Sequence, residues 1–332
     1  MKADLITGFL GAGKTTFLKY YTRWLTSRGT RVGILVNDHG AVNVDVLLLD
    51  ELRSDLCDVE MVSAACGYDM HRLRFKTKLI QMAMAGAYDR ILVEPSGVFD
   101  VDEFFDLLYE SPLDRWYERG SVIAIVDARP GLQPAGAAEA SEESEYLLMT
   151  QTANAGLIVL SRVQELASDA DIPETVSRTA ARINRAMERF SCDRRIREPE
   201  ILAKNWEDLT EADWQRVLRS EYRGADHIKL PVDRENRFSS IFYMNEQLCM
   251  TEAELRTLAE ELLESSFCGR VLRVKGTVLS PDGTWLEVNA AGPDVSVRKA
   301  EAGQDILIIV GEDLKKEALD RRIRMYCSTG RE

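Results

Sequence analysis

Four short apolar runs in the first half of the chain contain almost no alternating polar residues: 32–36, 91–93, 122–126 and 157–160. Strands of a parallel sheet that helices cover on both faces have this pattern. Apolar residues recur at helical spacing after Lys14, which predicts an amphipathic helix there. The alternation of strand and helix over residues 1–165 therefore predicts a doubly wound, mostly parallel α/β fold.

The pattern changes after residue 165. Residues 166–235 are charged and helix-prone, so we expect a helical connector in which Trp206 and Trp214, at helical spacing, contact the core. From 236 to 327 the pattern predicts a small α+β domain. Its expected elements are strand 238–244, helix 251–265, strands 270–278, 284–289 and 305–310, and helix 313–324, with a hairpin turn at Asp282-Gly283 and Lys275, Lys315 and Lys316 on solvated faces.

Composition narrows the class of protein. The 332 residues carry a formal net charge of -13 and are 45% hydrophobic and 29% charged, as in soluble globular proteins. This acidic balance argues against general binding to nucleic acid or to a membrane surface. The chain has no apolar stretch of the roughly 20 residues that a membrane span needs and no signal-peptide core. The six cysteines form no disulfide framework, so we expect a cytoplasmic protein.

The segment Gly8–Thr15 matches the phosphate-loop pattern G-x-x-x-x-G-K-[ST] in full, between a predicted strand and a predicted helix. Lys14 is predicted to bridge the β- and γ-phosphates of a nucleotide, and the Thr15 hydroxyl to ligate Mg²⁺. A Gly-rich strand-to-helix turn without a ligand is the alternative. The residues predicted to cradle the phosphates are Gly8, Gly11, Ala12, Gly13, Lys14, Thr15 and Thr16.

Carboxylates follow two of the predicted strands, where ligands bind in open α/β sheets. Glu94 directly follows the run 91–93. We expect it to act near Mg²⁺, with the Gly97 N–H facing the γ-phosphate. Asp38 and Asp45 follow the run 32–36, and either is placed to reach Mg²⁺ or the attacking water. Glu94 as a helix cap, and 37–45 as an ordinary polar turn, remain alternatives.

Together, the phosphate loop and the segments 37–45, 94–97, 122–128 and 151–160 resemble the CobW-type (CobW/HypB/UreG-like) family of P-loop GTPases. Segments 269–276 and 306–311 resemble the C-terminal domain of that family. The resemblance implies a Mg²⁺-dependent GTPase that acts as a metallochaperone or matures a metal- or corrinoid-dependent client protein. The oligomeric state stays open, with a homodimer as one alternative.

The metal-binding motif departs from the family pattern. Family members carry Cys-x-Cys-Cys after the first switch region, whereas the corresponding stretch 63–69 has Cys66 alone. A Zn²⁺ site needs three or four ligands, which one thiolate does not supply. A replacement site for Zn²⁺, Co²⁺ or Ni²⁺ would combine Cys66, Asp69 and His71 with His39 or Cys57. The alternative is that Cys66 is a small buried apolar residue.

The base-reading motif departs as well. The resemblance assigns guanine recognition to Asn-Lys-x-Asp after the fifth strand, and this chain has Ser161, Arg162, Val163 and Gln164 there. The Arg162 stem is expected to cover one face of the base. The Gln164 amide replaces a carboxylate that accepts from two guanine N–H groups, so we expect weaker discrimination against ATP.

Three classes of function follow from these features. A slow nucleoside triphosphatase that assists metalloenzyme assembly is the leading hypothesis, since the sequence assigns no arginine finger. A nucleotide-gated binding module with little catalysis and no metal transfer is the alternative. A small-molecule kinase would normally carry an Arg-rich lid, and no such segment follows the fourth predicted strand.

Overall fold

The computed structural model describes two compact units, the first within residues 1–228 and the second within 238–327. The described residues are 1–9, 11–38, 49–63, 68–86, 88–95, 101–129, 142–166, 168–228, 238–244, 246–291, 294–300 and 303–327. Among the helices in these ranges, none combines the length and apolar composition that crossing a bilayer requires.

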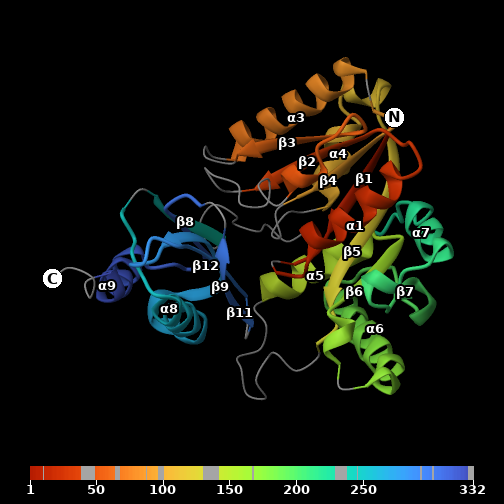
Figure 1. Ribbon diagram of the computed structural model, residues 1–332. Helices are drawn as coiled ribbons and strands as arrows, with labels where there is room; N and C mark the ends of the chain where they lie inside the picture. Colours follow the sequence, from red (N-terminus) through yellow and green to blue (C-terminus); the bar gives the residue numbers. More distant parts are fainter. Residues whose placement is uncertain are drawn as a thin grey trace. The chain divides into compact units, whose positions relative to one another are not determined.

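The first unit is built on a seven-stranded sheet in the order β3-β2-β4-β1-β5-β6-β7, and every pair of neighbours is parallel (Figure 1). Its strands are β1 (Lys2–Thr7), β2 (Val32–Asp38), β3 (Cys57–Ser63), β4 (Arg90–Glu94), β5 (Glu118–Asp127), β6 (Leu157–Ser161) and β7 (Ile201–Leu202). Its helices are α1 (Lys14–Thr26), α3 (Tyr68–Ala85), α4 (Val101–Leu108), α5 (Glu142–Ala153), α6 (Ile172–Arg189) and α7 (Glu211–Leu218).

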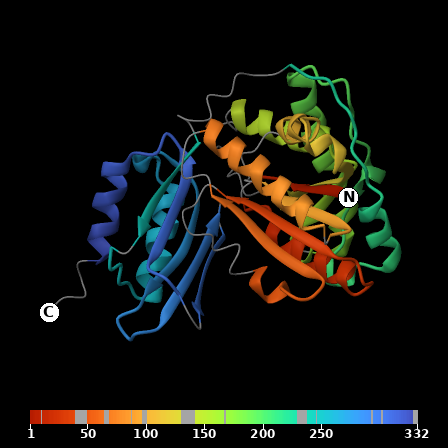
Figure 2. The ribbon, with the colours of Figure 1, turned by 90° about the horizontal axis from the view of Figure 1, so that it is seen from above.

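Both faces of this sheet are covered. Successive residues of a strand point to opposite faces, so Leu5 and Ile6 belong to different apolar clusters. The cluster of Leu5 includes residues of α3, α4, α5 and α6, and that of Ile6 includes residues of α1 and α7. Figure 2 shows α1 and α3 on opposite sides of the strands. Burial on both sides explains the unbroken apolar runs in the sequence.

The buried carboxylate of Asp4 connects the amino half of β1, the central strand, to its neighbours. Asp4 on β1 is fully buried, and its carboxylate accepts hydrogen bonds from the Arg90 guanidinium, the Tyr21 hydroxyl (3.0 Å) and the Ser121 N–H (2.7 Å). A buried carboxylate is stable only with such partners. The contacts tie β1 to β4, β5 and α1, the elements that surround the phosphate loop.

The second unit holds a five-stranded antiparallel sheet in the order β11-β10-β9-β12-β8. One apolar cluster joins the sheet to both helices of this unit, which lie on one of its faces (Figure 2). The elements are β8 (Phe238–Met244), α8 (Glu252–Glu264), β9 (Arg270–Leu279), β10 (Trp285–Ala291), β11 (Asp294–Ala300), β12 (Ile306–Glu312) and α9 (Lys316–Cys327).

Most of the predicted elements are confirmed. The four apolar runs are β2, β4, β5 and β6, the helix from Lys14 is α1, and Gly283 lies in the tight turn between β9 and β10. Strands β3, β7 and β11 were not predicted, and β7 lies within the expected connector. The segment 130–140, which is rich in Gly, Pro and Ala, lies outside the described residues.

The expectation for Lys275 was wrong. Lys275 is only 3% exposed, because it lies in β9, an interior strand between β10 and β12. Lys315 and Lys316 are exposed at the start of α9, as predicted.

Candidate functional site: a phosphate loop at the carboxyl edge of the parallel sheet

The predicted site residues converge on one edge of the first sheet. Because all seven strands are parallel, their carboxyl ends share that edge, where open α/β sheets bind ligands (Figure 1). Strand β1 leads into the phosphate loop, and its neighbours β4 and β5 end in Glu94 and Asp127. Strand β6, next to β5, ends in Ser161.

Two glycines of the loop are required by its geometry. Gly8 has φ +140°, and a Cβ there would lie 2.3 Å from the Ile125 carbonyl oxygen. Gly13 has φ +98°, and a Cβ there would lie 3.0 Å from the Trp206 ring. Side chains at these positions would combine a left-handed backbone with a steric clash, so the loop can follow this path only with glycine.

Lys14 reaches back into the loop that precedes it. The side chain is only 6% exposed, and Nζ donates to the carbonyl oxygens of Gly8 (3.0 Å) and Phe9 (3.3 Å). The ammonium therefore lies on the concave side of the loop, where a phosphate would meet it.

The first turn of α1 carries no competing cap. Among the described residues no side chain caps this turn, and it contains no acidic residue. By contrast, Thr210 and Thr251 cap α7 and α8 and accept hydrogen bonds from main-chain N–H groups. Thr16 is exposed in the first turn of α1. The N–H groups and the helix dipole of α1 are therefore available to an anion.

Thr15 joins the loop to β4. Its Oγ1 donates to Glu94 Oε1 at 2.8 Å, and Glu94 is 5% exposed. A hydroxyl and a carboxylate this close supply oxygen ligands of the kind that Mg²⁺ takes beside phosphates. Asp45 and Gly97, which were also predicted to contribute here, lie outside the described residues, as does the side chain of Asp38.

Ser161, at the end of β6, and Arg162, which follows it, also lie against the phosphate loop. Ser161 is buried, and a Cβ added at Gly13 would lie 3.6 Å from the Ser161 Cβ. Arg162 donates through Nη2 to the Gly11 carbonyl (2.9 Å) and through Nη1 to Asp127 Oδ2 (2.6 Å). Gln164 follows in a 3₁₀ turn, Val163–Glu165, with its side chain exposed.

Asp127 is a neighbour of the site that the sequence analysis did not single out. Arg129 donates to both of its oxygens, at 3.0 and 2.7 Å, in addition to the contact from Arg162. Burial raises the pKa of Asp127, but the two guanidinium groups outweigh it and hold the pKa below its usual value. Asp127 follows the run 122–126 as Glu94 follows 91–93, so the same pattern would have identified it.

Trp206 also lies against the loop, and no sequence signal identified that contact. Its Nε1 donates to the Leu160 carbonyl (3.0 Å), and its ring meets Phe17 edge-on at 5.4 Å between centroids. Trp214 stacks on Tyr21 at 6.0 Å. Both tryptophans contact the core as predicted. They lie in separate elements, a 3₁₀ turn (Trp206–Asp208) and α7, and not on one helix.

A second metal site cannot be assembled from the described side chains. Within the described ranges, no group of three or more His, Cys, Asp and Glu side chains is placed to hold a metal. Cys66, His39 and the side chains of Asp69 and His71 lie outside them. Cys57 is buried in β3, and burial raises the pKa of its thiol to about 11.

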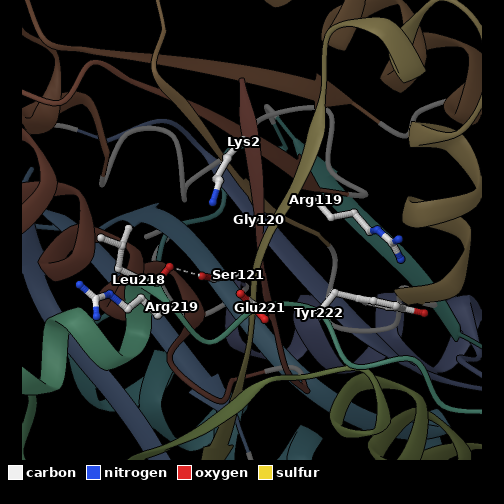
Figure 3. A pocket seen from close by; sticks show the side chains of 8 residues that line it. All are labelled: Lys2, Arg119, Gly120, Ser121, Leu218, Arg219, Glu221 and Tyr222. Carbon is white, nitrogen blue, oxygen red and sulfur yellow. Dashed lines mark hydrogen bonds between the residues drawn. The ribbon is translucent and has the colours of Figure 1, made fainter.

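A cavity of about 310 Å³ lies away from the loop, at the amino ends of β1 and β5 (Figure 3). Its lining includes Lys2, Arg119 and Glu221, and Ser121 donates to the Leu218 carbonyl there. Because β1 separates this edge from the phosphate loop, the cavity is no part of the candidate nucleotide site.

Comparison with known proteins bears on the family of the chain. The family model "CobW/HypB/UreG, nucleotide-binding domain" matches residues 2–190. The zinc chaperone YeiR of Escherichia coli (strain K12) is 25% identical over 308 residues, 89% of this chain and 88% of YeiR. The zinc chaperone CobW of Pseudomonas aeruginosa (strain PAO1) is 22% identical over 98% of this chain and 91% of its own length.

Among solved structures, the Zn(II)-bound YjiA GTPase from E. coli is 19% identical, covers 98% of both chains and gives a TM-score of 0.34. The family match spans more than half of the chain, including the phosphate loop, Glu94 and the strands β1 to β6. The chain therefore belongs to the CobW/HypB/UreG family of P-loop GTPases.

Proposed function

We propose that this protein is a Mg²⁺-dependent nucleoside triphosphatase, with GTP favoured over ATP, that acts as a metallochaperone or as a maturation factor for a metal- or corrinoid-dependent enzyme. One observation carries the proposal: the complete phosphate loop encloses Lys14 and is bonded through Thr15 to Glu94. The family match and the zinc chaperones among the relatives support the metal-related part.

In this proposal the residues of the phosphate loop and its neighbours have separate roles. Lys14 neutralises the β- and γ-phosphates, and the N–H groups of the first turn of α1 bind their oxygens. Thr15 would hold Mg²⁺, with Glu94 and Asp45 orienting the metal and the attacking water. The Gly97 N–H would face the γ-phosphate. Because no arginine finger can be assigned from the sequence, the protein would turn over slowly unless a partner supplies one.

Base recognition falls to the residues after β6. The stem of Arg162 would cover the base, with its guanidinium already held by Asp127 and Gly11. The Gln164 amide would accept from one guanine N–H where a carboxylate accepts from two, so the preference for GTP over ATP would be modest.

The names of the relatives support a proposal for the cargo. Zn²⁺ is the favoured cargo because the relatives are named as zinc chaperones, with Co²⁺ and Ni²⁺ as alternatives. Cys66 would supply one sulfur ligand, and the client or a second copy of the chain would complete the site. A cytoplasmic location is part of the proposal, because the spacing of the six cysteines in the sequence gives no disulfide framework.

Phosphate release from GTP and from ATP, measured for the wild type and for Lys14→Ala, tests the enzymatic part. We expect Lys14→Ala to lower hydrolysis by about 100-fold or more, because the loop loses its only side-chain cation. Lys19→Ala is the matched control: Lys19 lies on the same helix and pairs with Glu51 at the surface. Equal rates for Lys14→Ala and the wild type would contradict the proposal.

A second candidate is a nucleotide-gated binding module with little catalysis and no metal transfer. The single Cys66 in place of three cysteines favours it. Calorimetric titration with Zn²⁺, Co²⁺ and Ni²⁺ in the presence of GTP and Mg²⁺ separates the two candidates. Stoichiometric binding supports the chaperone, and its absence supports the module.

A further inference from the structure

The indole ring of Trp206 lies directly beside Gly13 in the phosphate loop. A Cβ added at Gly13 would lie 3.0 Å from Cη2 and 3.6 Å from Cζ3 of that ring. The edge of the ring therefore fills the place that a side chain at Gly13 would need. Trp206 comes from the expected connector, beyond the segment 2–190 that the family model matches.

Three contacts hold the indole ring in this position. Nε1 of Trp206 donates to the Leu160 carbonyl at 3.0 Å, which ties the ring to β6. The ring also meets Phe17 and Tyr20 of α1 edge-on, at 5.4 and 6.4 Å between centroids. Gly13, Phe17 and Tyr20 follow one another at helical spacing, so the ring lies along one face at the start of α1.

The two constrained glycines of the loop are supported differently. Gly8 lies against the main chain of β5, at the Ile125 carbonyl, which no substitution removes. Gly13 lies against side chains: the three atoms nearest to a Cβ there are two carbons of the Trp206 ring and the Ser161 Cβ. Gly13 has φ +98° and directly precedes α1, so the path of the loop at this point depends largely on one aromatic ring.

We propose that Trp206 is a positioning residue of the nucleotide site. It holds Gly13, and through it Lys14 and the first N–H groups of α1, in the conformation that binds the phosphates. This role rests on the proposed function, because it has an effect only if the loop binds a nucleotide. Without the ring Gly13 can relax into the space left behind, since glycine has the widest backbone freedom. A displacement of about 1 Å can lower a rate by about 100-fold.

The effect should be the same for both nucleotides, because Trp206 acts on the half of the site that binds phosphates. We expect Trp206→Ala to weaken the binding of GTP and of ATP by about 10-fold or more each, with the ratio of the two affinities unchanged. Trp206→Phe keeps an aromatic ring and loses the hydrogen bond to Leu160. It should recover part of the affinity that Trp206→Ala loses.

Calorimetric titration of the full-length protein with GTP and with ATP, each with Mg²⁺, tests this role. Trp214→Phe is the matched control. Trp214 lies in the same connector and packs against the same helix, at Phe17 and Tyr21, but it is not among the nearest neighbours of Gly13. This variant should bind both nucleotides as the wild type does.

Tryptophan fluorescence separates positioning from general packing. Phosphates bound by the loop place negative charge close to the indole of Trp206, so GTP with Mg²⁺ should change the emission of the wild type. Trp206→Phe should lose this change, and Trp214→Phe should keep it.

Three results would overturn this role: wild-type affinities for Trp206→Ala, equal losses of affinity in Trp206→Ala and Trp214→Phe, or an emission change that persists in Trp206→Phe. In each of them the wild type still binds nucleotide, so the proposed function stands. A wild type that binds neither GTP nor ATP would overturn the proposed function, and the role of Trp206 with it.

Discussion

The two halves of the candidate site are built differently. The phosphate half (Gly8–Thr15 and Glu94) presents main-chain groups and side chains held at short range, such as Thr15 against Glu94 at 2.8 Å. The base half (Ser161, Arg162 and Gln164, with Asp127) holds Arg162 between Asp127 and the Gly11 carbonyl and leaves Gln164 exposed. The first half keeps the full pattern of its motif, whereas the second departs from it.

Under the proposed function, the difference reflects what each half has to recognise. A phosphate is bound by a backbone conformation, and the glycines that permit it cannot change without a clash, as at Gly8. A base is distinguished by one or two side chains at the surface, which can change without disturbing the fold. Under the proposed function, loss of the Asp in the base-reading motif therefore alters the choice of nucleotide and leaves its binding intact.

The largest effect should follow a change in the phosphate half. Glu94→Gln keeps an acceptor for Thr15 and removes the charge proposed to act at Mg²⁺. We expect hydrolysis to fall by about 10- to 100-fold and the Mg²⁺ requirement to rise, with a smaller change in nucleotide affinity. Phosphate release measured against Mg²⁺ concentration reports both.

Glu60→Gln is the matched control for Glu94→Gln. Glu60 also lies on a strand of the first sheet, but it pairs with Lys78 at 2.9 Å and is partly exposed. This variant should keep wild-type rates. Wild-type rates for Glu94→Gln at every Mg²⁺ concentration would show that Glu94 only fastens the loop to β4.

A medium effect is expected in the base half. Gln164→Asp restores a carboxylate that can accept from two guanine N–H groups. A hydrogen bond to a charged group contributes about 1.5–3 kcal/mol, so the ratio of GTP to ATP affinity should rise by about 10-fold or more. Calorimetric titration with each nucleotide and Mg²⁺ measures this ratio.

Gln164→Asn isolates the charge in that experiment, because it keeps an amide at the same position. We expect its affinity ratio to match the wild type. If Gln164→Asp also leaves the ratio unchanged, the base is read by residues other than those after β6.

Sequence patterns located the elements and residues whose signals are local. The apolar runs identified β2, β4, β5 and β6 because both faces of these strands are buried. Strands β3 and β11 lie at sheet edges and carry charged residues, so they lack that signal. Strand β7 has two residues, too few for any period.

The same distinction applies to the site. Lys14 and Thr15 belong to one continuous motif, and Glu94 directly follows an apolar run, so all three could be selected from the sequence. The pairing of Asp127 with Arg162 depends on the register of β5 against β6, which sets Asp127 opposite Ser161. The contact of Trp206 with Gly13 depends on how the chain folds after β7. Neither leaves a periodic or motif signal.

The smallest effect should come from the ion pairs behind the base half. Asp127→Asn leaves Arg129 and Arg162 without the carboxylate that binds both, and should lower the free energy of unfolding by about 1–2 kcal/mol at pH 7. The folded-state pKa of Asp127 lies below its unfolded value, so this stabilisation is complete above the unfolded pKa of about 3.9. It is lost as the pH falls through the folded-state pKa.

Denaturant unfolding from pH 7 to pH 3 should therefore show the wild type and Asp127→Asn converging at the acid end, while the exposed control Asp55→Asn stays close to the wild type throughout. A gap that keeps its size down to pH 3 would mean that shape and hydrogen bonding, and not the charge of Asp127, stabilise this half of the site.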